Sequence, residues 1–276
     1  PRERGAAGQW ARVEAGVGDA ADTAQLGVHL LVLVLRRVEE YRRPVAFRLD
    51  KHELGALVDL NLYNNHLSAL PASLGRLLEL RRLAANCNRL EALPESFGEL
   101  HRLTYCDLRQ NSIQDLPENL GSLASLRCLH LQENQLSRLP EDLSGLVRLE
   151  ELYLYLNCLS ALPESIGELR SLRVLWVFRN NLTTLPASLG RLGNLVDLKL
   201  WQNALFSLPD DLAGMQALLY LDLGANALHS LPESLGRLPA LIHLNMEDNE
   251  LERLPSNLQW ATQLQKLSLN RNRLAE

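Results

Sequence analysis

Residues 172–194 read LRVLWVFRNNLTTLPASLGRLGN, and this stretch contains the pattern from which most of the chain is built. It opens as LxxLxL, continues to an asparagine at Asn180 and reaches a Leu-Pro pair at 185–186. Side chains two residues apart on a β-strand share a face. Leu175 and Val177 would therefore point inward, whereas Trp176 and Phe178 would point toward solvent. The role of these two rings depends on the sequence around them.

The same pattern, LxxLxLxxNxLxxLPxxLxxLxx, recurs every 23 residues. Nine complete copies and a truncated tenth begin, in order, at Leu57, Leu80, Leu103, Leu126, Leu149, Leu172, Leu195, Leu218, Leu241 and Leu264. All ten copies keep the asparagine, from Asn65 to Asn272, and the nine complete copies keep the proline. Self-similarity at a fixed period of this length indicates a repeat architecture.

The motif resembles that of leucine-rich-repeat proteins of the 23-residue class. It is similar to intracellular scaffolds of the Ras-binding and Erbin type and to bacterial effectors. The resemblance covers residues 57–276. It implies an α/β fold: a curved solenoid with a parallel sheet on its concave face and short helical or 3₁₀ turns on its convex face. It says less about function, because this fold serves many partners.

The residues themselves predict the path of each coil. LxxLxL gives a short strand whose leucines alternate inward, and each coil buries its leucines against those of the next. The asparagine lies in the turn after the strand, where its amide can satisfy backbone groups of its own and the adjacent coil. Proline ends the inner loop, because it restricts the residue before it and donates no N–H. Segments such as 164–169 then form the outer turn.

The two ends of the chain depart from the repeat. Residues 1–22 are rich in Gly, Ala and Arg, and we expect them to form a mobile segment. Residues 23–43 predict a helix that begins at Asp22 or Thr23 and stops at Pro44. With a degenerate strand at 45–49, this makes 23–56 a cap over the first coil, since an open solenoid end exposes leucines. The truncated copy that ends at Glu276 predicts that the natural chain continues.

Composition narrows the classes of function. A net charge of −5 and a pI near 5.9 argue against nucleic acid and anionic membranes. The longest apolar run, residues 28–35, is too short to span a bilayer. The four cysteines form no CxxC pair, which favours a reducing compartment. We therefore expect a cytoplasmic protein without cofactor, metal or small-molecule substrate, delivered into a host cell if it is a bacterial effector.

The outward positions of successive strands should form columns along the sheet, roughly 4.8 Å apart from coil to coil. Five aromatic residues gather in these columns in copies five to seven: Tyr153, Tyr155, Trp176, Phe178 and Trp201. Flanking and surrounding positions add polar and apolar neighbours that complete a predicted partner-binding surface: Arg179, Leu156, Glu151, Lys199, Gln202, Arg109 and Gln132.

Two interpretations of this cluster remain open. Aromatic residues in register can stabilise a ladder by cross-strand contact alone, at roughly 0.2–1 kcal/mol per pair. Alternatively, an apolar patch rimmed by polar groups is typical of a binding surface, and Trp, Tyr and Arg are the residue types favoured at binding hot spots.

One group of residues raises the question of catalysis. Cys128 and His130 share a strand and a face, Asp107 should neighbour His130 in the preceding coil, and Glu133 is near in sequence. Such a set is conceivable as a thiol nucleophile or a metal site. Against this, the strand rise places Cys128 and His130 roughly 7 Å apart, and an open sheet offers no oxyanion hole. We therefore expect an ordinary polar surface here and no catalytic residues.

The sequence thus predicts a non-catalytic domain that binds a protein or peptide across the aromatic cluster on its concave face. The alternative is that the chain is the substrate-recognition arm of a larger enzyme, such as a ubiquitin ligase, kinase or GTPase, whose catalytic domain lies beyond residue 276.

Overall fold

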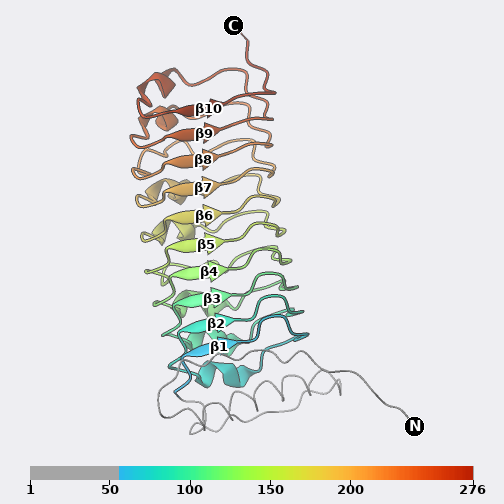
Figure 1. Ribbon diagram of the computed structural model, residues 1–276. Coiled ribbons are helices and arrows are strands. Elements are labelled where there is room, and N and C mark those ends of the chain that lie inside the picture. Colours follow the sequence, from blue (N-terminus) through green and yellow to red (C-terminus); the bar gives the residue numbers. More distant parts are fainter. Residues whose placement is uncertain (1–55, 276) are drawn as a thin grey trace, which may run out of the picture.

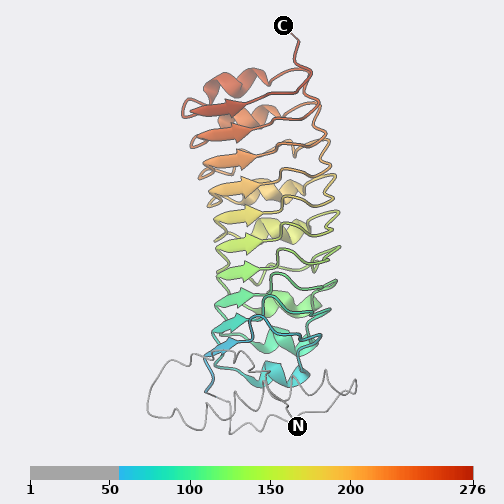
Figure 2. The ribbon, with the colours of Figure 1, turned by 45° about the vertical axis from the view of Figure 1, so that its right-hand side comes forward.

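The computed structural model describes residues 56–275, in which each 23-residue copy forms one coil of a solenoid (Figure 1). The coils stack in chain order, with the strands in one column and the outer turns behind them (Figure 2). The mobile segment predicted for 1–22 and the helix predicted for 23–43 lie outside the described residues.

One three-residue strand per coil builds a single parallel sheet whose order follows the sequence. Except in the last strand, where Leu267 is 39% exposed, the middle residue is a core leucine or its equivalent, so that Leu152 pairs with Leu175 and Leu175 with Leu198. This register aligns every repeat position with its counterpart 23 residues away. The strands are β1 (Asp59–Asn61), β2 (Arg82–Ala84), β3 (Tyr105–Asp107), β4 (Cys128–His130), β5 (Glu151–Tyr153), β6 (Val174–Trp176), β7 (Asp197–Lys199), β8 (Tyr220–Asp222), β9 (His243–Asn245) and β10 (Lys266–Ser268).

The repeat leucines form one continuous core along the inside of the coils. In the coil of residues 172–194, Leu172, Leu175, Val177 and Leu182 are all fully buried. Trp176 and Phe178 lie on the opposite side of the strand and are only partly buried. The inward and outward positions therefore alternate as the sequence predicts.

The repeated asparagine joins adjacent coils, as predicted from its position after the strand. Asn180 Nδ2 donates to the carbonyl of Leu154 in the preceding coil and to that of Val177 in its own, each at 3.0 Å. Its Oδ1 accepts the backbone N–H of Leu159 at 3.0 Å. A side chain that supplies both donors and an acceptor satisfies buried backbone groups for which the sheet has no partner.

The outer turns are 3₁₀ helices in most coils, and each begins directly after the repeat proline. Among residues 56–275, no helix is long and apolar enough to cross a membrane. The helices are η1 (Ala72–Arg76), η2 (Glu95–Glu99), η3 (Glu118–Ser122), η4 (Glu164–Glu168), η5 (Ala187–Arg191), η6 (Glu233–Arg237) and η7 (Ser256–Trp260).

Two complete coils within the described part of the chain turn without such a helix. Their glycines, Gly145 and Gly214, come one position later than the glycines of six other complete coils. An aspartate stabilises each turn instead: Asp142 Oδ1 accepts the N–H of Ser144 at 2.9 Å, and Asp211 Oδ1 accepts that of Ala213 at 3.0 Å. Aspartate side chains favour turns by bonding to the backbone two residues on.

Candidate functional site

The outward columns bring the five predicted rings together on the solvent side of β5, β6 and β7 and in the loops that follow these strands. We call these residues the aromatic patch: Tyr153, Tyr155, Trp176, Phe178 and Trp201. Tyr153 is in direct register with Trp176. Each ring is partly buried, since its neighbours cover part of its surface.

The rings of the aromatic patch contact one another continuously. Tyr155 and Phe178 stack with centroids 4.4 Å apart and planes within 7°, and Phe178 stacks on Trp201 at 4.6 Å and 14°. Tyr153 meets the Trp176 ring edge-on at 5.0 Å and 80°. Offset stacking and edge contacts are the favourable geometries for aromatic pairs. These contacts hold the rings in fixed positions, so that the surface is formed before any partner arrives.

Polar groups fix the Trp176 side chain in this arrangement. Its Nε1 donates to Asp197 Oδ2 at 2.8 Å. Lys199 Nζ lies 3.8 Å from the centroid of the Trp176 ring and 3.7 Å from Asp197 Oδ2. The ammonium group is therefore shared between a carboxylate and a π-face, which is a favourable placement for a partly desolvated cation.

Glu151 borders the aromatic patch on the side of β4. Its Oε2 accepts a hydrogen bond from the Tyr153 hydroxyl at 3.0 Å and one from Cys128 Sγ at 3.4 Å. Burial, together with this hydrogen bond to Glu151, raises the pKa of Tyr153 above its ordinary value. Tyr153 therefore stays protonated and keeps donating to the carboxylate.

Three of the predicted flanking residues lie next to the aromatic patch, one in each of the turns that follow β5, β6 and β7. Arg179 lies with its Cζ 5.2 Å from the centroid of the Trp201 ring, and its Nε donates to Gln202 Oε1 at 2.7 Å. Leu156 is 36% exposed and adds apolar surface. Arg179, Gln202 and Leu156 all have a left-handed backbone, with φ between 52° and 56°.

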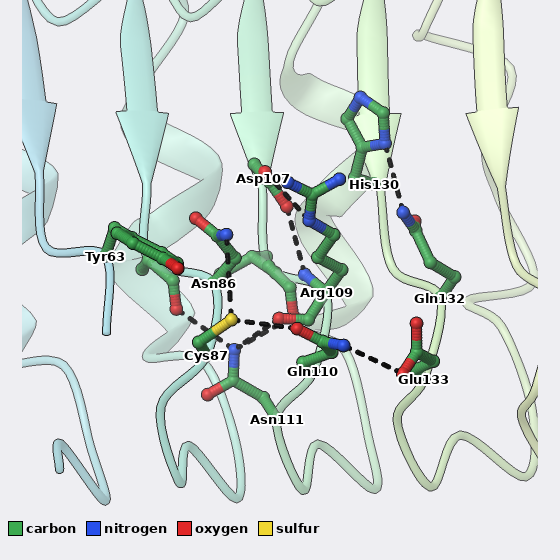
Figure 3. Close-up of polar contacts among 12 residues, drawn as sticks. Tyr63, Asn86, Cys87, Asp107, Arg109, Gln110, Asn111, His130, Gln132 and Glu133 are labelled. Carbon is green, nitrogen blue, oxygen red and sulfur yellow. Dashed lines mark hydrogen bonds and ion pairs between the residues drawn. The ribbon is translucent and has the colours of Figure 1, made fainter. Parts of the chain in front are cut away.

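Arg109 and Gln132, which were also predicted as part of the binding surface, lie in the two coils before the aromatic patch, where each contacts a polar neighbour. Arg109 lies beside Asp107, with its Nε 3.5 Å from Asp107 Oδ2 (Figure 3). Gln132 is only 2% exposed, and its Nε2 lies 3.3 Å from His130 Nδ1. Its amide is positioned to support His130 rather than to contact a partner.

The line of rings extends further than predicted, toward the N-terminal coils. The His130 ring stacks on Tyr153 at 4.6 Å and 10°, and Tyr105 lies 5.5 Å from His130 on the other side. The signal was present in the sequence, because His130 precedes Tyr153 by one repeat and occupies the same column.

The distance predicted between Cys128 and His130 is wrong for their side chains. Cys128 Sγ and His130 Nε2 are 3.2 Å apart, within hydrogen-bonding distance for sulfur. The rise along a strand fixes the spacing of the backbone, but the two side chains lean toward each other. The thiol and the imidazole are therefore close enough to interact. Whether the thiol is reactive depends on the pKa values of the two groups.

Burial shifts the pKa of both members of this pair in the direction that favours the neutral form. Burial, with the Glu151 carboxylate next in importance, raises the pKa of the Cys128 thiol to about 12. Burial lowers the pKa of His130 below its ordinary value, against the opposing effect of Asp107. A reactive cysteine requires a lowered thiol pKa, so this contact is a hydrogen bond between neutral groups.

Asp107 and Glu133 do not complete a metal site with this pair. Asp107 is buried and interacts with Arg109, and Glu133 Oε2 accepts from Gln110 Nε2 at 3.0 Å (Figure 3). Within residues 56–275, no group of three or more His, Cys, Asp or Glu side chains is arranged to hold a metal ion.

Known proteins with a similar sequence or structure share the repeat architecture. Two family models match: a leucine-rich repeat region over residues 47–157 and a leucine rich repeat over residues 193–251. A solved leucine-rich-repeat protein of Leptospira interrogans is 30% identical, and the match covers 79% of this chain and 68% of that one with a TM-score of 0.53. The chain is a leucine-rich-repeat protein. Among curated proteins, none matches it.

Two further solved proteins are also similar to this leucine-rich-repeat protein. The plant peptide hormone receptor RGFR1, solved in complex with RGF2, is 28% identical with a TM-score of 0.64. Toll of Drosophila, solved in complex with Spatzle, is 26% identical with a TM-score of 0.69. Each match covers 80% of this chain but only 41% of the RGFR1 chain and 34% of the Toll chain. The likeness to Erbin-type scaffolds and bacterial effectors stays a prediction.

A cavity of about 380 Å³ lies on the sheet face of the leucine-rich-repeat chain, next to the aromatic patch. It spans β7, β8 and β9, and it shares Asp197 and Lys199 with the surroundings of Trp176. We call it the β7–β9 cavity; its lining residues are Asp197, Lys199, Tyr220, Leu221, Asp222 and His243.

Proposed function

We propose that this leucine-rich-repeat protein is a non-catalytic binding domain that holds a protein or peptide partner on the aromatic patch. The observation that carries the proposal is the preformed surface of five mutually contacting rings, bordered by Lys199, Arg179 and Glu151. Partly desolvated aromatic rings with charged neighbours are typical of the residues that dominate binding energy. The similar structures of RGFR1 in complex with RGF2 and of the Toll–Spatzle complex support a role in protein recognition.

The proposal places the protein in the cytoplasm, and the four cysteines support this because all are unpaired. The raised pKa of the Cys128 thiol supports a role without catalysis. A recognition arm of a larger enzyme, as the alternative prediction has it, would use the same surface in the same way.

The experiment compares the wild-type chain with the double variant Trp176→Ala/Trp201→Ala. Proteins captured from a cell extract by each immobilised chain are quantified by mass spectrometry, and thermal unfolding is followed in parallel. We expect the captured partner to fall by at least about tenfold, since truncated hot-spot aromatics cost more than 1 kcal/mol each. The melting temperature should fall by less than about 5 °C, since ladder contacts contribute little individually.

The matched control is Phe206→Ala/Trp260→Ala, which truncates two rings that are 52% and 54% exposed outside the aromatic patch. Capture by this variant should equal that of the wild type. The proposal is wrong if partner capture and melting temperature fall together in the Trp176→Ala/Trp201→Ala variant, or if the control variant captures as little partner. The rings would then only stabilise the sheet.

A further inference from the structure

The β7–β9 cavity has an excess of negative charge. Two carboxylates, those of Asp197 and Asp222, line it together with one ammonium group, that of Lys199. Lys199 is already engaged, since its Nζ lies on the Trp176 ring and near Asp197. Lys199 therefore balances Asp197, whereas within residues 56–275 no cation pairs with Asp222, and a cation that enters the cavity would meet the carboxylate charge of Asp222.

The two carboxylates also retain unused acceptor positions. Asp197 Oδ1 is buried and has no hydrogen-bond partner among the described residues. Asp222 Oδ1 accepts from the Gly224 N–H at 3.1 Å and from Asn245 Nδ2 at 2.9 Å. Within residues 56–275, Asp222 Oδ2 accepts no hydrogen bond. Asp197 Oδ1 has almost no exposed surface, so the acceptors that face a ligand are Asp222 Oδ2 and the Asp197 Oδ2 that also accepts from Trp176. Ionised acceptors form strong hydrogen bonds with charged donors, so a cationic ligand that brings several N–H groups would be favoured.

An aromatic ring faces the cavity beside these acceptors. Tyr220 is 44% exposed, and its ring meets that of His243 edge-on at 6.4 Å and 78°. Elsewhere on the sheet face, a cation of the protein lies against an aromatic ring at three places: Arg82 on Tyr105, Lys199 on Trp176 and Arg179 on Trp201. No cation from the described residues lies on Tyr220, so its π-face is free to receive one.

We propose that the β7–β9 cavity binds an arginine side chain of the partner, with its guanidinium against Tyr220 and its N–H groups directed to Asp197 and Asp222. Arginine fits better than lysine, because a planar guanidinium stacks on a ring and donates to two separate acceptors at once. The inference rests on the proposed function and names the partner's chemistry: a basic residue next to the apolar group that covers the aromatic patch.

The test titrates Nα-acetyl-arginine amide into the ¹⁵N-labelled chain. The reporter is the indole N–H of Trp176, which donates to Asp197, and the reference is that of Trp260, which is 54% exposed in η7. Arginine amide should shift the Trp176 signal saturably, and its neutral citrulline counterpart should not. Equal responses to arginine and citrulline, or no shift at Trp176 beyond that at Trp260, would overturn the proposal.

Three variants sharpen the result. Asp222→Asn keeps the size and the acceptor Oδ1, and it should weaken arginine binding at least about tenfold. Tyr220→Leu should weaken binding while Tyr220→Phe preserves it, which separates the ring from the hydroxyl. The charge-matched control is Asp59→Asn, which lies in the same column as Asp197 and forms an ion pair with Arg82; it should change binding by less than about twofold.

Lys199→Met tests the sign of the charge preference. If the cavity selects a cation, removal of the competing ammonium should strengthen arginine binding. If the cavity instead binds an anion through Lys199, acetate used as the probe should bind to the wild type and not to Lys199→Met. Arginine binding should then be the same in both proteins, and that outcome refutes the proposal.

The two proposals can fail separately. If arginine amide does not bind but partner capture still requires Trp176 and Trp201, the cavity proposal fails and the proposed function stands. If arginine amide binds but capture is independent of the aromatic patch, the proposed function fails.

Discussion

At the scale of single residues, an unfavourable backbone conformation recurs in every coil. The residue before each repeat asparagine has a positive φ between 50° and 58°, although none of these residues is glycine. A left-handed backbone costs about 1–2 kcal/mol for a residue with a side chain. The asparagine bonds that this turn positions offset the cost. The residues are Asn64, Cys87, Gln110, Glu133, Leu156, Arg179, Gln202, Ala225, Asp248 and Arg271.

Ala225→Gly should therefore stabilise the protein. Glycine relieves the left-handed strain but adds freedom to the unfolded chain, so we expect a net gain of about 0.5–1 kcal/mol. Urea unfolding measures it as a higher midpoint at an unchanged slope. The matched control is Ala84→Gly in β2, where φ is not positive and glycine should cost about 0.5–1 kcal/mol. A loss of stability in both variants would contradict the strain assigned to Ala225.

At the scale of elements, the outer turns pack so closely that most of their glycines are required by space rather than by backbone conformation. A Cβ added at Gly167 in η4 would lie 2.3 Å from the carbonyl oxygen of Ser188 in the next coil. At Gly193, outside the 3₁₀ helix, the nearest atom would be the Gly214 carbonyl oxygen at 3.4 Å, an ordinary contact.

Gly167→Ala should lower the free energy of unfolding by at least about 2 kcal/mol, because backbone of the adjacent coil must move. Gly193→Ala should change it by less than about 0.5 kcal/mol. Thermal unfolding of the two single variants is the measurement. An equal loss of unfolding free energy in the two variants would mean that adjacent 3₁₀ helices can move apart to accept a Cβ, so that their spacing does not require glycine.

At the scale of the whole molecule, each strand pairs only with its neighbours in sequence, so stability is passed from coil to coil. Two backbone hydrogen bonds of nearly equal length test this dependence on position. Leu154 N donates to Trp176 O at 2.8 Å in the middle of the solenoid, and Met246 N donates to Ser268 O at 2.9 Å near its end. Both donor residues are fully buried.

In native-state hydrogen exchange, the amide of Leu154 should be protected roughly a hundredfold more than that of Met246. Within the described residues, the coil that begins at Leu264 pairs with one neighbouring strand, whereas the middle coil pairs with two. Equal protection factors at the two amides would show that the whole described solenoid opens as one unit.

Much of this architecture follows from the sequence because each rule acts locally and repeats. The leucine alternation predicts the strands, and the position of Asn180 predicts its bonds to two coils. The helix-free turn at Asp142 is also encoded, since its glycine comes one position later, but the shift is visible only when the copies are aligned.

The features that the sequence did not reveal depend on side-chain direction. The approach of Cys128 to His130 depends on side-chain torsion angles, and the burial of Gln132 depends on the size of the side chains around it. The spacing of residues along the sequence fixes neither. The left-handed turn was equally hidden, because Leu156 and Ala225 are not residues that favour a positive φ.

The register of the sheet makes a whole coil the smallest unit by which this surface can be edited. Deletion of residues 172–194 would join Ser171 to Leu195 and leave every leucine, asparagine and proline in its place in the repeat. Tyr155 would then lie beside Trp201, in the same geometry that now holds it beside Phe178. Recombination between copies can therefore shorten, lengthen or reorder the row of rings without a new folding problem, and partner choice can change faster than the scaffold beneath it.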